Sequence, residues 1–288
     1  MTYSVTSKCC NKILVGKTYW KGMVLPSVLN GIGVMNVSNE VVENVQGIEN
    51  GVYRKILGAR GKTVLETLRG EVGASSSEVR FMQSKLMLAK SIWNSKNKLV
   101  RDIMERVRED GRNQWNKKLE EYLIKIKVTF EELVEMDKKD IKKKLNEYDS
   151  KKWKEGIEKK SSVKIYRRFK KEIKEERVYD NRRSSEILFQ ARVNCMALNN
   201  RYRHMRGGIT TCDLCKDGTE NLEHFLLSCE SLSGVRDIEI KNRNRSVDVE
   251  EWMGNILWKE KDVEGVKCML GNMWQRCVMR KRLGISER

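Results

Sequence analysis

SNEVVENVQGIENGVYRKILG, residues 38–58, carries the start, one face and the end of a single α-helix. Ser38 can cap the first turn with its hydroxyl group, and Gly58 suits the left-handed residue with which many helices end. Between them, apolar residues recur at intervals of three and four, which is the period of a helix buried on one side. The expected buried stripe is Val41, Val45, Ile48, Val52 and Ile56.

The remainder of the chain follows the same pattern, and we predict a mainly α fold. The 288 residues contain 1 Pro and are rich in Lys, Glu, Leu and Arg, so little interrupts a helix. A first helix is expected over residues 17–35, bent at Pro26. Another starts near Ser75 and continues, with a break near Asn94, through residue 107. Its expected inward residues are Val79, Met82, Leu86, Trp93, Leu99, Ile103 and Val107.

Further helices are expected downstream. One stripe consists of Trp115, Leu119, Tyr122 and Ile126, and one or two shorter helices should lie between residues 130 and 148. In the basic segment that follows, Tyr166, Phe169 and Ile173 fall on one helix face and should pack inward. Two more helices are expected after residue 250.

Four possible metal ligands lie close together, spaced Cys-x2-Cys-x8-His-x4-Cys: Cys212, Cys215, His224 and Cys229. Zinc prefers four tetrahedral sulfur and nitrogen ligands, and a gap of two residues lets two thiolates on one turn chelate the same ion. Residues 223–229 have the character of a short helix, on which positions five apart both reach inward. We predict one structural zinc ion. The alternative is ordinary cysteines and a surface histidine that fall at ligand spacing by accident.

Cysteine usage indicates a reducing compartment. The other cysteines, at positions 9, 10, 195, 268 and 277, show no spacing typical of a disulfide framework, and no signal peptide is recognisable. The most apolar N-terminal stretch, residues 23–37, is interrupted by Pro26 and two glycines, and is shorter than the roughly 20 residues that span a bilayer. We expect an intracellular protein, in the nucleus or the cytoplasm, with no membrane partner.

Positive charge is concentrated in the middle of the chain. Residues 138–206 hold 23 Lys or Arg and 10 Asp or Glu, which accounts for +13 of the net +18. Such a surplus binds polyanions, because contacts to phosphates release counterions. We predict RNA and/or DNA as the partner, contacted by Lys151, Lys152, Trp153, Lys164, Arg167, Arg168, Lys170, Lys171, Arg201, Arg203 and Arg206. The alternative is a solvated helical face, partly neutralised by nearby glutamates.

Trp153 allows two interpretations. It stands among Lys151, Lys152 and Lys154, so its ring could stack on a base beside phosphate contacts. A single tryptophan on a helix is more often an anchor in the core.

Catalytic chemistry is not evident in the sequence. A two-metal polymerase or nuclease needs clustered carboxylates, and the chain has neither an Asp-Asp pair nor a Tyr-x-Asp-Asp loop. There is no nucleophile elbow, phosphate-binding loop or zinc-deaminase pattern, and a zinc ion with four protein ligands has no open position for water. With His224 assigned to the metal, His204 is interpreted as a neighbour of phosphate rather than a general base.

The order of these features resembles the C-terminal part of the reverse transcriptase of non-LTR (LINE-type) retrotransposons, downstream of the polymerase palm. Residues 20–31, WKGMVLPSVLNG, are similar to the segment after the palm, except that Asn30 stands where Tyr is usual. Residues 49–58 and the run LRGEVG at 68–73 look like the helical thumb of that family. The Cys-Cys-His-Cys pattern matches its zinc knuckle ligand for ligand. The resemblance covers nearly the whole chain.

The resemblance implies four regions: a thumb-like helical region over 1–135, a basic helical nucleic-acid-binding region over 136–206, a zinc knuckle over 207–232, and C-terminal helices over 233–288. It implies a role in gripping template RNA and target or primer DNA, with the palm upstream in the same chain of an intact element. The catalytic aspartates of the palm have no counterpart here. We therefore expect a truncated element or partial gene model, without polymerase activity of its own.

Two other interpretations remain open. The first is a free-standing RNA- or DNA-binding protein with a zinc knuckle, either domesticated from such an element or unrelated to it. The second is a helical scaffold whose basic face only keeps it in solution.

Overall fold

The computed structural model describes residues 11–61, 63–205, 207–236 and 248–283. Within these ranges the chain consists of helices and turns, and β-pairing is confined to two isolated bridges, Val72 with Glu175 and Thr211 with Thr219. The mainly α class predicted from the sequence is confirmed. Among the described helices, none combines the length and the apolar character that crossing a membrane requires.

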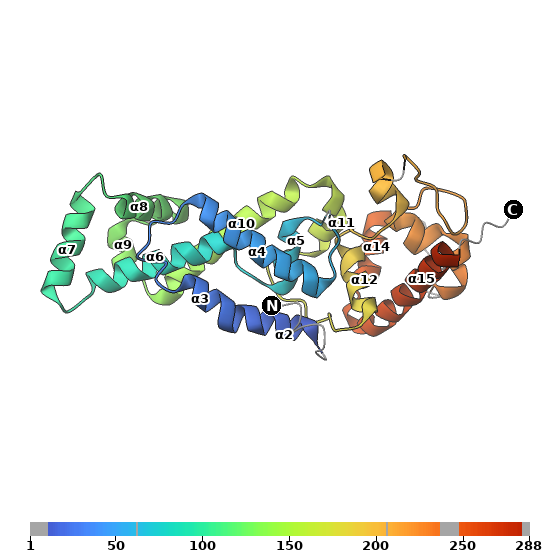
Figure 1. Ribbon diagram of the computed structural model, residues 1–288, viewed down its shortest axis with the longest axis horizontal. Coiled ribbons are helices and arrows are strands. Elements are labelled where there is room, and N and C mark those ends of the chain that lie inside the picture. Colours follow the sequence, from blue (N-terminus) through green and yellow to red (C-terminus); the bar gives the residue numbers. More distant parts are fainter. Residues whose placement is uncertain (1–10, 62, 206, 237–247, 284–288) are drawn as a thin grey trace.

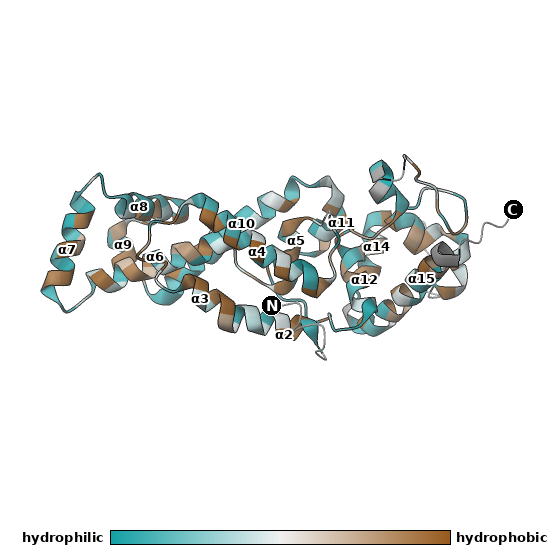
Figure 2. Ribbon diagram, viewed as in Figure 1, coloured by the Kyte–Doolittle hydropathy of each residue, from teal (hydrophilic) through white to brown (hydrophobic). Residues whose placement is uncertain are grey.

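The helices form an elongated molecule, with α7 (Lys98–Glu109) at one end and α15 (Val263–Leu283) towards the other (Figure 1). Apolar and polar residues alternate along the same helices (Figure 2), as expected where each helix buries one face. The N-terminal segment comprises α2 (Lys12–Tyr19), a π-helical turn η1 (Trp20–Val24) and α3 (Leu25–Leu29). The helix predicted over residues 17–35 ends at Leu29, and the π turn η1 precedes Pro26, which lies in the first turn of α3, where a missing N–H is tolerated.

The ends of α4 (Asn39–Leu57) are as predicted, but its buried face is not. The Ser38 hydroxyl accepts a hydrogen bond from the Val41 N–H, and Gly58 closes the helix at φ +66°. Val52 and Ile56 are buried, whereas Val41 and Ile48 are 45% and 61% exposed. Beside Val52 and Ile56, the inward face is formed by Val42, Glu49, Tyr53 and Leu57, each one position after a predicted residue, and by Asn50.

Glu49 explains this rotation of α4. Its carboxylate is fully buried and accepts hydrogen bonds from Arg80 Nη1 at 2.8 and 2.9 Å and from Trp20 Nε1 at 2.9 Å. Tyr53 also donates its hydroxyl to this carboxylate. A buried charge requires such partners, so the face that carries Glu49 turns towards them.

A smaller core lies towards the α7 end of the molecule. It is built by α6 (Ser77–Trp93), α8 (Gln114–Ile126), α9 (Phe130–Glu135) and the first half of α10 (Lys138–Glu158). Its centre contains the following predicted inward residues: Val79, Met82, Leu86, Leu119, Tyr122 and Ile126.

The stripe predicted on α7 is wrong. Leu99 and Ile103 are 66% and 53% exposed, and Met104 is the residue of α7 that is buried. The helix does break where expected, because Asn94 ends α6 and Asn97 caps α7. α7 lies across the end of the molecule, and besides Met104 it contacts the smaller core through Arg108, whose Cζ lies 3.7 Å from the centroid of the Phe130 ring.

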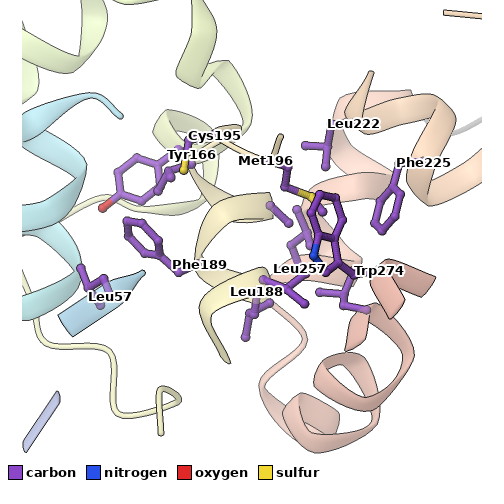
Figure 3. Packing of buried hydrophobic residues seen from close by; sticks show 14 of the residues in the cluster. Leu57, Tyr166, Leu188, Phe189, Cys195, Met196, Leu222, Phe225, Leu257 and Trp274 are labelled. Carbon is purple, nitrogen blue, oxygen red and sulfur yellow. The ribbon is translucent and has the colours of Figure 1, made fainter. Parts of the chain in front are cut away.

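The larger core joins the rest of the chain. It combines α4, α5 (Leu65–Val72), the second half of α10, α11 (Lys164–Phe169), α12 (Arg183–Arg192), α14 (Val249–Leu257) and α15. Figure 3 shows Leu57 and Tyr166 on one side of α12 and Phe225 and Trp274 on the other. This core includes residues from all four regions expected from the sequence, whereas most of the buried apolar residues between Val79 and Leu145 belong to the smaller core.

The LRGEVG run at 68–73 is the point where α5 meets the basic segment. A Cβ on Gly70 would lie 2.3 Å from Tyr166 Oη and 2.9 Å from Trp153 Cζ2. Gly73 has φ +62°, and a Cβ there would lie 2.5 Å from the Glu175 backbone nitrogen. These glycines are therefore required by close packing.

The charged residues of the same run are paired inside. Arg69 Nη2 donates to both carboxylate oxygens of Asp149 at 2.7 Å, and Glu71 lies 3.7 Å from Arg192 Nη1. Each pair ties α5 to a different helix, α10 or α12.

Candidate metal centre and adjoining basic cleft

The fold brings Cys212, Cys215, His224 and Cys229 together. Their ligand atoms all lie within 4.8 Å of one another. Cys212 Sγ is 3.9 Å from Cys229 Sγ, and Cys215 Sγ is 3.3 Å from His224 Nε2. Three sulfurs and one imidazole nitrogen at these separations can surround a metal ion, as the spacing in the sequence predicted.

A tight turn presents the first two ligands. The Cys212 N–H donates to Gly218 O at 3.1 Å, and the Lys216 N–H donates to Cys212 O at 3.0 Å. Lys216 and Gly218 both have left-handed backbones, at φ +60° and +66°. A Cβ on Gly218 would lie 3.2 Å from His224 Nδ1, so glycine leaves room for the imidazole.

A π-helical turn, η4 (His224–Ser228), presents the other two ligands. The Cys229 N–H donates to His224 O at 2.8 Å, which is the i to i+5 bond of a π-helix. On a regular α-helix, residues five apart point about 140° away from each other. The wider turn reduces this angle and lets His224 and Cys229 face the same point.

The orientation of the His224 ring suits metal binding. Nε2 faces the cysteine sulfurs, while Nδ1 lies 3.4 Å from Ser228 Oγ on the other side of the ring. In metal sites, a partner on the second ring nitrogen commonly fixes the tautomer and the orientation.

The surroundings shift the pKa values of three of these groups, Cys212, Cys229 and His224, in the direction that favours their uncharged forms. Burial raises the pKa of the Cys212 thiol, and burial with the neighbouring Cys212 and Cys215 sulfurs raises the pKa of Cys229 to about 12. Burial and the charge of Arg236 lower the pKa of His224. A bound cation would reverse the balance at the cysteines, because it stabilises thiolates directly.

The ligand turns belong to the larger core. Phe225, next to His224, packs edge-on against Trp274 of α15, with ring centroids 6.2 Å apart at 70°. Leu226 and Leu232 are also buried there. The zinc-knuckle region, residues 207–232, therefore packs against α15.

Hydrogen bonds connect the knuckle to η3 (Asn199–Met205), the 3-10 helix that carries Arg201 and Arg203. The Glu220 carboxylate accepts from the Asn199 N–H at 2.7 Å, and Glu220 O accepts from the Asn200 N–H at 3.1 Å. Asn199 Nδ2 donates to Thr211 O at 2.7 Å. Asn199 and Glu220 are both buried, so the metal loop sets the position of η3.

A cleft of about 830 Å³ lies between η3, the knuckle, α11 and α14. Charged and polar side chains line it: the basic Lys164, Arg201, Arg203 and His204, the acidic Glu223 and Glu250, and the amides Asn194 and Asn200. Its floor is apolar and includes Val163, Met196, Leu198 and Met253, all at most 5% exposed. Sequence reasoning missed this cleft, because its walls come from distant parts of the chain.

Most of the predicted nucleic-acid contacts are at the surface. The exposed ones are Lys151, Lys152, Lys164, Arg167, Arg168, Lys171 and Arg203, and Arg201 is half-buried. The structure brings Lys164, Arg201 and Arg203 together at the cleft, and leaves Lys151 and Lys152 apart on α10. Arg206 lies outside the described residues.

Carboxylates already engage some of these cations. Arg168 reaches Asp248 and Glu251, each at 2.6 Å, and Lys152 reaches Glu78 at 2.5 Å. Arg168 is therefore less available to a phosphate than the sequence suggested.

Trp153 and Lys170 must be removed from the predicted interface. Trp153 is 2% exposed and donates its Nε1–H to Glu66 O at 2.8 Å, so it is the core anchor and not a base-stacking platform. Lys170 is 6% exposed and forms an ion pair with Glu176, because α11 ends at Phe169 and the chain turns inward. The helix face predicted through Ile173 ends at the same point.

No protein-family model matches this sequence, no curated protein matches it, and no solved structure matches its fold.

Proposed function

We propose that this protein binds nucleic acid through the basic surface of residues 138–205 and that Cys212, Cys215, His224 and Cys229 hold one structural zinc ion. In keeping with the resemblance described above, we propose the role of a non-catalytic C-terminal part of a retroelement reverse transcriptase, gripping template RNA or target DNA. The observation that supports binding most strongly is the outer surface of α10.

α10 buries one side and exposes lysines on the others. Ile141, Leu145, Trp153 and Ile157 are spaced by multiples of four and face the core. Lys142, Lys143 and Lys144 are exposed, and no carboxylate of the described residues pairs with them. Unpaired surface lysines can neutralise phosphates and so release the counterions that are condensed on a nucleic acid backbone.

Salt dependence provides the test of binding. Affinity for a short nucleic acid should fall steeply between about 50 and 200 mM salt, because each phosphate contact contributes roughly 0.7 to 0.9 to the logarithmic slope. Replacing Lys142, Lys143 and Lys144 together with Gln should reduce that slope by about 2 to 3.

A charge-matched control separates a specific surface from net charge. Lys96, Lys98 and Lys117 are exposed and lie outside the basic segment, so their triple Gln variant has the same net charge as the α10 variant. It should keep the wild-type slope. If both variants lose the same amount of slope, binding depends on net charge and not on the α10 surface. If the wild-type protein does not bind nucleic acid even at low salt, the alternative of a helical scaffold with a solubilising basic face is supported.

Zinc is favoured by the donor set. Three thiolates and one imidazole are soft and borderline ligands, which suit Zn²⁺ in a closed tetrahedral site. Metal analysis of protein purified without chelator should find one zinc ion per chain, and Cys212→Ser should lose it. Cys268→Ser is the control, because Cys268 is exposed and outside the cluster. Retention of zinc by Cys212→Ser would contradict the assignment.

The retroelement role and an independent protein predict different genomic contexts. An in-frame palm with a Tyr-x-Asp-Asp loop upstream of Met1 supports part of a polymerase. A promoter and a start codon at Met1 support the free-standing nucleic-acid-binding protein.

A further inference from the structure

We infer that the cleft beside the knuckle accepts an unpaired end of a nucleic acid strand, one to a few nucleotides long, while the α10 surface contacts the backbone of the adjoining duplex. This inference rests on the proposed function, since it concerns which part of the same nucleic acid contacts the cleft and which part contacts α10. It assigns a ligand to the cleft, whereas the positive charge of residues 138–205 alone accounts only for binding at an open surface.

The chemistry of the cleft matches a nucleotide in two respects. Arg203 is exposed at its rim, where a cation can meet a phosphate, and Lys164 is exposed there too, with the Glu250 carboxylate 3.9 Å from its Nζ. Met196, Leu198 and Met253 form an apolar floor that suits the face of a base. Contacts to phosphates alone, such as those proposed for α10, do not require an apolar floor.

Amide groups supply contacts for base edges. Asn194 and Asn200 line the cleft, together with Asn221 from the knuckle. Unpaired bases expose their Watson–Crick edges, and amide side chains can both donate to and accept from these edges. In a duplex the same edges are already paired.

The size of the cleft favours single-stranded nucleic acid. Its volume of about 830 Å³ falls in the range of roughly 300–1,000 Å³ that encloses small ligands. A space of this size can hold one nucleotide, and a frayed or overhanging strand can place a nucleotide there without the opening of a base pair.

The walls of the cleft are held in place before any ligand arrives. Glu220 fixes the start of η3 through the Asn199 N–H at 2.7 Å. On the opposite wall, Asn194 Nδ2 donates to Ser162 O at 3.2 Å, joining the end of α12 to the turn before α11. A preformed site avoids much of the entropic cost of ordering loops on binding.

The experiment compares three probes: a short single strand, a blunt duplex, and the same duplex with an overhang of about three nucleotides. Fluorescence anisotropy at one low salt concentration gives the affinities of the full chain. We expect the overhang duplex to bind about tenfold more tightly than the blunt duplex, which equals roughly one charge-assisted contact. The double variant Lys164→Gln with Arg203→Gln should lose this preference, so the readout is the ratio of the overhang affinity to the blunt affinity and not either affinity alone.

The matched control is Lys142→Gln with Lys143→Gln on α10, which should weaken both duplexes and keep the overhang preference. If wild-type protein binds blunt and overhang duplexes equally, the cleft inference fails and the proposed function stands. If it binds none of the probes, the proposed function fails as well. Displacement of the overhang probe by a free mononucleotide at equal concentration would assign the cleft to small nucleotides and overturn the strand inference.

Discussion

Replacing Gly70 with Ala tests whether the LRGEVG run is a packing requirement. The added methyl would lie 2.3 Å from Tyr166 Oη and 2.9 Å from Trp153 Cζ2, well inside the roughly 3.5–4.0 Å of an ordinary contact. Both rings are almost completely buried, at 0% and 2% exposure, so neither can swing into solvent. Overpacking of this kind costs about 1–3 kcal/mol.

The effect of Gly70→Ala on the backbone stabilises the folded protein, opposite to the effect of overpacking. Gly70 lies inside α5, and Ala is more favourable than Gly in a helix interior by about 0.5–1 kcal/mol. Because buried aromatic rings would have to move, we take the upper part of the overpacking range. We therefore expect Gly70→Ala to lower the free energy of unfolding by about 1–2 kcal/mol.

Gly47→Ala is the matched control for this substitution. Gly47 also lies inside a helix, α4, but a Cβ there would have no neighbour within 4 Å. This variant should gain about 0.5–1 kcal/mol from the backbone term alone. Urea unfolding followed by circular dichroism measures both variants. Equal stabilisation of the two would refute the packing argument for Gly70.

Other predictions concern the buried and half-buried charges. Arg69→Met leaves the Asp149 carboxylate, 2% exposed, without its cation, so urea unfolding should show a loss of about 3–5 kcal/mol. A loss below about 1 kcal/mol, typical of an exposed pair, would contradict this. Burial raises the pKa of Glu78, but hydrogen bonds from Lys152 and Lys125 outweigh burial and hold the pKa below its usual range. The stability contributed by Glu78 is therefore present above about pH 4.3 and is lost as the pH falls through the lower folded-state pKa. Glu78→Gln should destabilise the protein near neutral pH, and its difference from wild type should shrink in acid; a constant difference would show that ionisation is not involved.

Local signals predicted the ends of α4 and the four side chains that the fold brings together as possible metal ligands. Ser38, Gly58 and the Cys-x2-Cys turn act through neighbours a few residues away, so their roles can be read from the chain itself. The inward face of α4 could not be read in this way. Glu49 faces inward because Trp20 and Arg80 meet it there, and no periodicity of apolar residues contains that information.

Trp153 shows a signal that was present in the sequence. It shares a four-residue spacing with Ile141, Leu145 and Ile157, which places it on the buried side of α10. The lysines around it suggested exposure, but they occupy the other sides of the same helix. The cleft, in contrast, requires residues from α11, η3, the knuckle and α14 to meet, which only the tertiary fold determines.

The contact between Phe225 and Trp274 has a practical consequence. The indole of Trp274 is 8% exposed and touches a ring adjacent to the ligand His224. Its fluorescence should therefore respond when the turn around His224 loosens, so this tryptophan would report optically on a metal ion held by the proposed ligands. The chain has 7 tryptophans, so the difference between wild type and Trp274→Phe would isolate that signal. Metal exchange at the knuckle could then be followed in real time without a label.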